Sequence, residues 1–249
     1  MTGREEIISR IRKALGRAAD GSRATAESSL PPASPLAGIL PAIPREELLP
    51  RFEAEFTKVA GTAHRAANRQ ALEEILRSIL SQATANSVVL SRNPLLGELN
   101  LAPLLRGWGK GISVWPDFGA GDAPELGEVS QQDFAKASFA ATVGITGVEF
   151  ALAETGSLVV TSRTEGAQLA SLAPPVHIAL YRRSQLVASF DEVLERLPVP
   201  RAVEEAATGR SVVFITGTSR TADIEQILIR GVHGPGEVHA VLVEAECLS

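Results

Sequence analysis

The run VVFIT at 212–216 is apolar and mostly β-branched, and it is followed by GTSRTADIE. This pattern predicts a buried strand, a turn centred on Gly217 and then a helix. In an open α/β sheet, ligands bind at such turns, outside the carboxyl ends of strands. Free backbone N–H groups at a helix start favour anions. Hydroxyl donors are added here by Thr216, Thr218, Ser219 and Thr221. The segment is therefore a candidate site for an anionic ligand group.

Asp223 lies in the helix that is predicted after this turn. Ile224, Ile227 and Leu228 mark the core side of that helix, and Asp223 stands one turn before Ile227. This spacing directs Asp223 inward, where a carboxylate needs a partner or has a role in a site. Helix capping is the alternative, because Thr221 is a good N-cap and an acid in the first turn complements the helix dipole.

A second candidate segment, residues 144–157, has the sequence GITGVEFALAETGS. The Gly-Ser pair at its end, flanked by apolar runs, predicts a hairpin turn. Glu154 directly follows a largely apolar run, where an unpaired carboxylate would be costly. Glu154 therefore belongs at a strand end, in an ion pair or in a functional site, and the sequence leaves these alternatives open.

Two histidines complete the set of candidates. His233 stands in GVHGPG at 231–236, a loop of three glycines and a proline. There it is suited to act as a general base or ligand donor, or to bond the backbone of its own loop. His177 follows two prolines inside a predicted strand, and a core role fits its position as well as a site role does.

Residue spacing excludes several common sites. The chain has neither a G-x-x-x-x-G-K-[ST] phosphate loop nor a G-x-G-x-x-G fingerprint after a strand, and its four histidines form no metal-ligand pattern. Ser219, Asp223 and His233 occur in the Ser–acid–His order, but an acid four residues after the serine is unusual for a triad. Cys247 is the only cysteine, so the chain cannot form an intrachain disulfide or hold an iron–sulfur cluster alone.

Composition limits the partners and the location. The 249-residue chain is 45% hydrophobic, which is typical of a folded globular protein. Its net charge of −5 argues against nucleic acid as the main partner, because phosphate backbones attract clustered Lys and Arg. No apolar run reaches the ~18–20 residues that cross a bilayer, and no signal-peptide core is present near the start. We therefore expect a cytoplasmic protein without a membrane span.

Three regions are expected along the chain. Residues 1–16 predict an amphipathic N-terminal helix, because isoleucines recur at helical spacing with charges on the other face. Residues 17–44 are rich in Pro, Ser and Ala and predict a linker. Residues 45–249 form the main domain.

Helix and strand patterns alternate in the first half of the main domain. This predicts an α/β fold with three layers, α/β/α, around a mostly parallel sheet. Neighbouring strands without a helix between them predict an antiparallel hairpin inside that sheet. The predicted helices of the main domain are 45–60, 69–81, 96–108, 130–141, 191–197 and 222–230. The predicted strands are 61–66, 87–90, 112–115, 148–153, 158–162, 176–181, 185–187, 212–216 and 238–244.

Taken together, these segments resemble the LUD-domain family. The likeness is carried by GITGVEFALAETGS at 144–157, TGTSRTADIE at 216–225 and GVHGP at 231–235, in that order. The helix and Pro-rich linker at the N-terminus look like those of the family's stand-alone branch, the lactate-utilisation C proteins. One position departs from the family pattern, because Thr218 stands where a proline usually follows the glycine. The likeness extends to Leu172, Pro174, Pro175, His177 and Ile178.

The resemblance implies both a fold and a role. The fold would be similar to the NagB/RpiA/CoA-transferase-like group. The role would be that of a subunit that supports oxidation of L-lactate to pyruvate in a three-protein system. The partners would carry the iron–sulfur clusters, and this chain would carry no cofactor of its own.

The same resemblance assigns roles to the candidate residues. Glu154 would be the acid/base or nucleophile, since CoA-transferases use a glutamate. Asp223 would orient the binding groups, and His233 would cover the ligand. No metal ligand is expected. The binding residues for a small carboxylate or phosphate would be Thr155, Gly156, Thr216, Gly217, Ser219, Thr221 and His177.

Two other functions stay open from the sequence. An independent small-molecule enzyme, acting on a phosphorylated or CoA-linked metabolite, would bind its ligand in isolation and need Glu154. A non-catalytic binding or scaffold module would use its N-terminal helix to dock a partner. The sequence does not determine the oligomeric state or the identity of the ligand.

Overall fold

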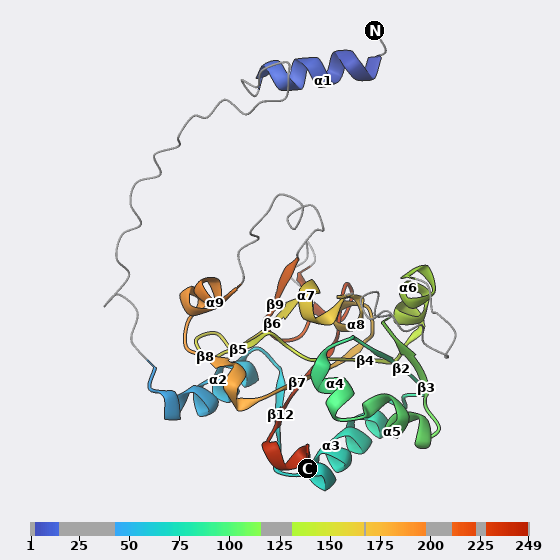
Figure 1. Ribbon diagram of the computed structural model, residues 1–249, viewed down its shortest axis with the longest axis vertical. Coiled ribbons are helices and arrows are strands. Elements are labelled where there is room, and N and C mark those ends of the chain that lie inside the picture. The colour runs from blue at the N-terminus through green and yellow to red at the C-terminus, as the bar shows by residue number, and fades with distance from the viewer. Residues whose placement is uncertain are drawn as a thin grey trace. The chain divides into compact units, whose positions relative to one another are not determined.

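The computed structural model describes residues 3–14, 43–115, 131–166, 168–197, 211–222 and 228–248 (Figure 1). The chain divides into two units, Met1–Pro41 and Ala42–Ser249. In the first unit, α1 (Gly3–Ala14) forms where the N-terminal helix is predicted. Residues 15–42, which include nearly all of the predicted linker, lie outside the described residues.

The second unit is built on six parallel strands in the order β1-β12-β7-β4-β2-β3. Sequences such as VHIALY and EVHAVLV are almost continuously apolar, which is typical of parallel strands buried on both faces. Because side chains alternate along a strand, β1, β2, β7 and β12 each contribute apolar side chains to two separate cores. The strands are β1 (Thr62–Ala66), β2 (Ser87–Leu90), β3 (Gly111–Val114), β4 (Val143–Thr146), β7 (Val176–Tyr181) and β12 (Glu237–Val243).

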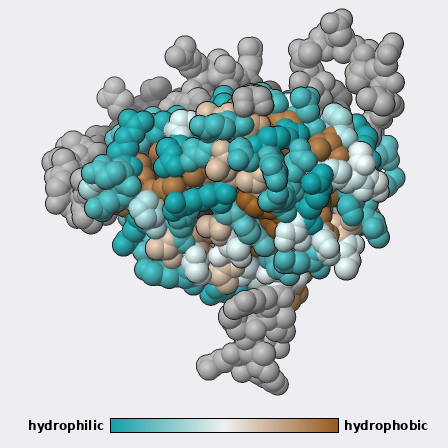
Figure 2. All heavy atoms as spheres, turned by 90° about the horizontal axis from the view of Figure 1, so that it is seen from below, coloured by the Kyte–Doolittle hydropathy of each residue, from teal (hydrophilic) through white to brown (hydrophobic). Residues whose placement is uncertain are grey.

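One face of this sheet is covered by α3 (Arg69–Gln82), α4 (Pro94–Glu98) and α5 (Leu101–Gly107). Helix α3 begins after Asn68, whose side chain accepts a hydrogen bond from the Ala71 N–H at 2.9 Å. The buried leucines of α3 recur at helical spacing and pack against apolar side chains of β2, β4, β7 and β12. Seen from below, the described surface is mostly hydrophilic, with hydrophobic residues in narrow areas between (Figure 2).

The other face is covered by a second sheet and by helices (Figure 1). The order of this second sheet is β8-β5-β6-β9. Phe52 and Phe56 of α2 are 0% exposed and share one core with side chains of both sheets. The elements on this side are the 3-10 turn η1 (Arg45–Glu47), α2 (Leu48–Lys58), α6 (Gln131–Ala140), β5 (Phe150–Leu152), β6 (Ser157–Thr161), α8 (Leu169–Leu172), β8 (Leu186–Val187), α9 (Phe190–Arg196) and β9 (Val212–Ile215).

The α/β class and the mostly parallel sheet are therefore confirmed. The antiparallel hairpin also forms, as β5 and β6, but it belongs to the second sheet and not to the parallel one. The predicted helix 96–108 is two short helices, because Asn100 between them adopts a left-handed conformation with φ 49°. No helix among the described residues is long and apolar enough to span a membrane.

The predicted helix 222–230 is wrong at both of its ends. The structure has two short antiparallel strands there, β10 (Arg220–Ala222) and β11 (Leu228–Arg230), with Thr221 opposite Ile229. A short apolar run cannot be assigned by periodicity alone, and β-branched residues favour strands. Thr221 is consequently a strand residue and not an N-cap. Residues 223–227, including Asp223, lie outside the described residues.

Strand β4 is missing from the prediction, although it is central to the parallel sheet. Ile145 and Thr146 lie between Gly144 and Gly147, and closely spaced glycines are more typical of turns than of strands. Gly144 serves close packing instead, because a Cβ at this position would lie 1.7 Å from the carbonyl oxygen of Ala170 in α8. The described elements also include α7 (Ser162–Glu165), η2 (Arg183–Gln185) and η3 (Ala245–Cys247).

Candidate functional site

The strand order of the parallel sheet reverses between β2 and β4. The chain runs from β2 outward to the edge strand β3 and then returns to β4, on the other side of β2. In open α/β folds, ligands bind at such a point, in the crevice outside the carboxyl ends of the strands. Residues 91–93 follow β2 and residues 147–149 follow β4, so these two loops border the crevice.

A buried carboxylate joins these two loops. Glu165, the last residue of α7, is 0% exposed. Its Oε2 accepts hydrogen bonds from Ser91 Oγ at 2.5 Å and from the Gly147 N–H at 3.0 Å. Its Oε1 accepts a hydrogen bond from Asn93 Nδ2. Burial raises the pKa of Glu165, and these donors act in the opposite direction. The carboxyl group thus fixes both rims of the crevice through a single side chain.

A cleft of about 250 Å³ opens near this cluster, lined in part by Asn93. Two of its carboxylates are neutralised, because Glu98 pairs with Arg182 and Glu149 pairs with Arg163 at 2.6 Å. The Nε–H of Arg182 is buried and has no acceptor among the described residues. The lining of the cleft is therefore polar, and its charged groups Glu98, Glu149 and Arg182 are all held in ion pairs.

The sequence-predicted binding segments meet elsewhere in the molecule. Three hydroxyls form a chain: Ser157 Oγ lies 2.7 Å from Thr155 Oγ1 and 2.7 Å from Thr216 Oγ1. The turn after β9 also contacts the loop before β12. The Ser219 N–H donates to the Pro235 carbonyl at 2.8 Å, and the Gly231 N–H donates to the Ser219 carbonyl at 3.0 Å. The structure thus brings together the AETGS hairpin, the TGTSR turn and the GVHGP loop.

This hydroxyl turn, residues 155–157 and 216–219, lies at the amino ends of the parallel strands. The Gly236 N–H donates to the Pro175 carbonyl at 2.9 Å, and β12 and β7 begin directly after these residues. The turn packs on the end of α2. Gly217 has φ 79°, and a Cβ there would lie 2.0 Å from the Val59 carbonyl oxygen, so only glycine fits. The location differs from the carboxyl-end position expected from the sequence.

Glu154 and His233 are placed differently from the hydroxyls. The Glu154 carboxylate accepts a hydrogen bond from the Phe190 N–H at 3.0 Å, at the start of α9. It is therefore a strand-end carboxylate that satisfies a free helix N–H, which is one of the alternatives left open by the sequence. His233 is exposed in its glycine loop, close in sequence to Pro235.

His177 lies inside the molecule. It is 0% exposed, and its Nε2 lies 2.9 Å from Thr146 Oγ1. Burial lowers its pKa to about 3, so the ring is neutral at pH 7. The buried polar atoms that lack a hydrogen-bond partner among the described residues include His177 Nδ1 and, within the hydroxyl turn, Thr218 Oγ1. Such atoms are rare in folded proteins, and a bound water, an ion or a ligand can supply the missing partner.

The comparison with protein families decides the assignment. The family model described as the LUD domain matches residues 49–243, which extend from α2 to the end of β12. The chain belongs to the LUD-domain family. The matched segment includes both the Glu165 cluster and the hydroxyl turn.

Curated relatives of this LUD protein share one name. It is 31% identical over 173 residues to "Lactate utilization protein C" of Halalkalibacterium halodurans, covering 70% of this chain and 69% of the relative. It is 26% identical over 245 residues to the protein of the same name from Oceanobacillus iheyensis, covering 97% of this chain and 98% of the relative. The second match includes the N-terminal segment that precedes the LUD domain.

A solved structure shows the same fold. The crystal structure of a DUF162 family protein from Deinococcus radiodurans superposes with a TM-score of 0.51 at 21% identity. The match covers 81% of this chain and 99% of the crystallised one. The likeness supports the α/β architecture of the LUD domain.

Sequence reasoning missed the Glu165 cluster of the LUD domain. One signal was available, because SRNP follows the apolar run SVVL directly and thus places polar side chains at the carboxyl end of a strand. Glu165 itself gave no signal. It is separated from Ser91 by 74 positions and from Asn93 by 72, so only the folded chain joins them.

Proposed function

We propose that this LUD-domain protein is a subunit that supports oxidation of L-lactate to pyruvate, together with separate iron–sulfur partner proteins. The observation that carries the proposal is the match to lactate utilization protein C relatives, which extends over nearly the whole of both chains. A relative that matched only the LUD domain would say nothing about the N-terminal segment. The match over nearly the whole chain favours a role like that of the lactate utilization protein C relatives.

The chemistry of the reaction supports a division of labour between chains. Oxidation of L-lactate breaks the C2–H and O–H bonds and releases two electrons and two protons. Iron–sulfur clusters accept electrons and are commonly held by four thiolates. Cys247 is the only cysteine of this chain, is 2% exposed, and donates its S–H to the Ala66 carbonyl at 3.2 Å. In this proposal the electrons therefore pass to clusters on the partners.

The proposed ligand at the hydroxyl turn is a small carboxylate. Thr155 and Thr216 carry hydroxyls that are linked through Ser157, and Gly156, Gly217 and Ser219 belong to the same two turns. The buried Thr218 Oγ1, which has no partner among the described residues, supports a polar ligand here. Glu154, Asp223 and His233 remain the proposed catalytic residues.

Growth of the native host tests the proposal. The chromosomal copy is deleted and replaced with wild type, Glu154→Gln or Glu195→Gln, and growth on L-lactate is compared with growth on pyruvate. Glu154→Gln keeps an acceptor for the Phe190 N–H and therefore preserves the fold. Glu195, exposed on α9, is the matched control.

We expect the deletion strain and Glu154→Gln to lose growth on L-lactate while keeping growth on pyruvate. Glu195→Gln should grow like wild type on both. Normal growth of the deletion strain on L-lactate would refute the proposed function. Normal growth of Glu154→Gln alone would remove Glu154 from the catalytic residues and leave the subunit role intact.

A further inference from the structure

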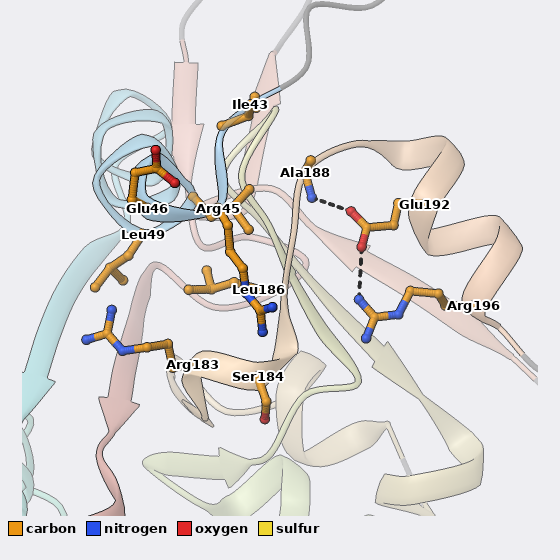
Figure 3. Close-up of a pocket in the computed structure, with 11 residues that line it drawn as sticks. Ile43, Arg45, Glu46, Leu49, Arg183, Ser184, Leu186, Ala188, Glu192 and Arg196 are labelled. Carbon is orange, nitrogen blue, oxygen red and sulfur yellow. Dashed lines mark hydrogen bonds and ion pairs between the residues drawn. The ribbon is translucent and has the colours of Figure 1, made fainter. Parts of the chain in front are cut away.

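A second, larger cavity of about 880 Å³ lies next to the first cleft and shares Ser184 with it (Figure 3). Three segments form its walls: η1 with the start of α2, residues 183–188 after β7, and α9. Arg183 and Ser184 follow the carboxyl end of β7 almost directly, so the cavity opens at the edge of the sheet where α/β folds bind ligands. Its volume lies within the range of small-molecule sites.

The floor of this cavity is aliphatic. Leu48 and Leu49 come from α2, Leu186 and Ala188 from the connection after β7, and Ile43 from the segment before η1. The lining contains no aromatic side chain. A flat base or ring would thus find no stacking partner, whereas an alkyl chain would bury its methylene groups against leucines.

The rim of the cavity carries three guanidinium groups, although the chain as a whole has a net charge of −5. Arg183 pairs with Glu244, and Arg196 pairs with Glu192 at 3.0 Å. The carboxylate of Glu192 is further occupied by the Ala188 N–H, at 2.7 Å. Little negative charge is therefore left on this side to oppose an anion.

Arg45 is the available cation of the rim. Its guanidinium makes no hydrogen bond or ion pair with the residues that the structure describes. Figure 3 shows this guanidinium directed toward Ser184 and Leu186, over the aliphatic floor. The same view shows Glu46, the remaining carboxylate of the lining, on the opposite side of its backbone turn.

We propose that this cavity binds an amphipathic aliphatic anion, with a phosphate or carboxylate head on Arg45 and an alkyl chain on the leucine floor. Guanidinium groups bind both heads through charge-assisted hydrogen bonds. The site is independent of the function proposed above, because it uses none of the residues of the hydroxyl turn. Its failure would leave that function standing.

Calorimetric titration of the full chain tests this site. The probes are decyl phosphate and decanoate below their micelle-forming concentrations, hexyl phosphate as the shorter chain, and inorganic phosphate as the head alone. We expect one decyl phosphate per chain, weaker binding of hexyl phosphate by up to about fourfold per missing methylene, and no measurable binding of inorganic phosphate. Added salt should weaken the binding.

Two variants locate the ligand. Arg45→Gln should weaken decyl phosphate binding about tenfold without unfolding the protein, because Arg45 is exposed and unpaired among the described residues. Arg106→Gln, an exposed arginine on α5 at the other face of the sheet, should bind like wild type.

Three results would overturn the proposal. The first is the absence of saturable binding by either decyl probe, and the second is equal affinity of wild type and Arg45→Gln. The third is binding to phosphatidylglycerol vesicles without binding of monomeric decyl phosphate, which would indicate attraction to a charged surface. Binding of the monomer with no gain on vesicles supports a soluble ligand, and an added gain on vesicles supports a lipid source for the same chemistry.

Discussion

Replacing Glu165 with alanine should destabilise the fold more than any exposed substitution. The change leaves three donors without their acceptor: Ser91 Oγ, Asn93 Nδ2 and the Gly147 N–H. Ser91 is 2% exposed and Asn93 7%, so bulk water does not replace the carboxylate. An unsatisfied buried donor costs about 1–3 kcal/mol.

Burying the carboxylate also costs free energy, and the alanine variant avoids that cost, which offsets part of the destabilisation. We therefore expect Glu165→Ala to lower the free energy of unfolding by about 3–5 kcal/mol, the cost of three unsatisfied donors less the part that is offset. That is a large part of the roughly 5–15 kcal/mol that stabilises a typical domain. Urea unfolding followed by circular dichroism measures this difference as a shift of the midpoint, with the slope of free energy against urea concentration unchanged.

Glu165→Gln separates charge from shape. It keeps one acceptor oxygen, so we expect a smaller loss of about 1–3 kcal/mol at pH 7. Burial raises the pKa of Glu165 above its ordinary value of 4.5. The favourable contribution of the protonated group is therefore complete below that value and is lost as pH rises through the folded-state pKa. Glu165→Gln should remove this part of the pH dependence.

Glu195→Ala is the control, because an exposed substitution changes stability by about 0.5 kcal/mol or less. The reasoning is refuted if Glu165→Ala and Glu195→Ala unfold at the same urea concentration. It is also refuted if Glu165→Gln keeps the full pH dependence of wild type.

Three further predictions concern other parts of the fold. Burial lowers the pKa of His177 from 6.5 to about 3, so the stability of the wild type should fall as the pH drops below 6.5. The loss should reach up to about 1.4 kcal/mol per pH unit. His177→Gln should flatten this dependence in urea unfolding measured between pH 7 and 4. Gly144→Ala should lower the free energy of unfolding by about 3 kcal/mol or more in the same assay, because the added methyl group meets the Ala170 carbonyl. Gly97→Ala in α4 is the control and should be neutral or stabilising, because the space around Gly97 is open. Thr216→Val should cost about 1 kcal/mol by removing the hydrogen bond to Ser157, and Thr216→Ser should not; equal effects of the two would contradict the hydroxyl chain.

The sequence was sufficient for the class of fold because its periodicities are local. Helix α3 has leucines at helical spacing and an asparagine cap, and β7 is a continuous apolar run, so both follow from neighbouring residues. Strand β4 was missed because Gly144 and Gly147 are typical of turns. Their small size is needed for contacts with Ala170 and Asn93, which only the packed structure provides.

The candidate sites depend even more on tertiary contacts. The three motif segments could be selected from residue types, and the structure does bring them together through Ser157, Thr216 and Ser219. Their position at the amino ends of the parallel strands could not be derived, because it depends on the second sheet. The Glu165 cluster joins loops that are far apart in the chain, and the only local signal for it is the polar run that follows the apolar strand at 87–90.

The central claim is that the chain works as a LUD-domain subunit of a lactate-oxidising system, and co-purification tests it most directly. The tagged full chain is isolated from its native host grown on L-lactate, and the eluate is examined by visible spectroscopy and by a lactate-to-acceptor assay. The account predicts brown, cluster-bearing partner proteins and absorbance changes on addition of L-lactate. A colourless, partner-free protein, with no lactate-dependent reduction, would contradict it and favour an independent small-molecule enzyme.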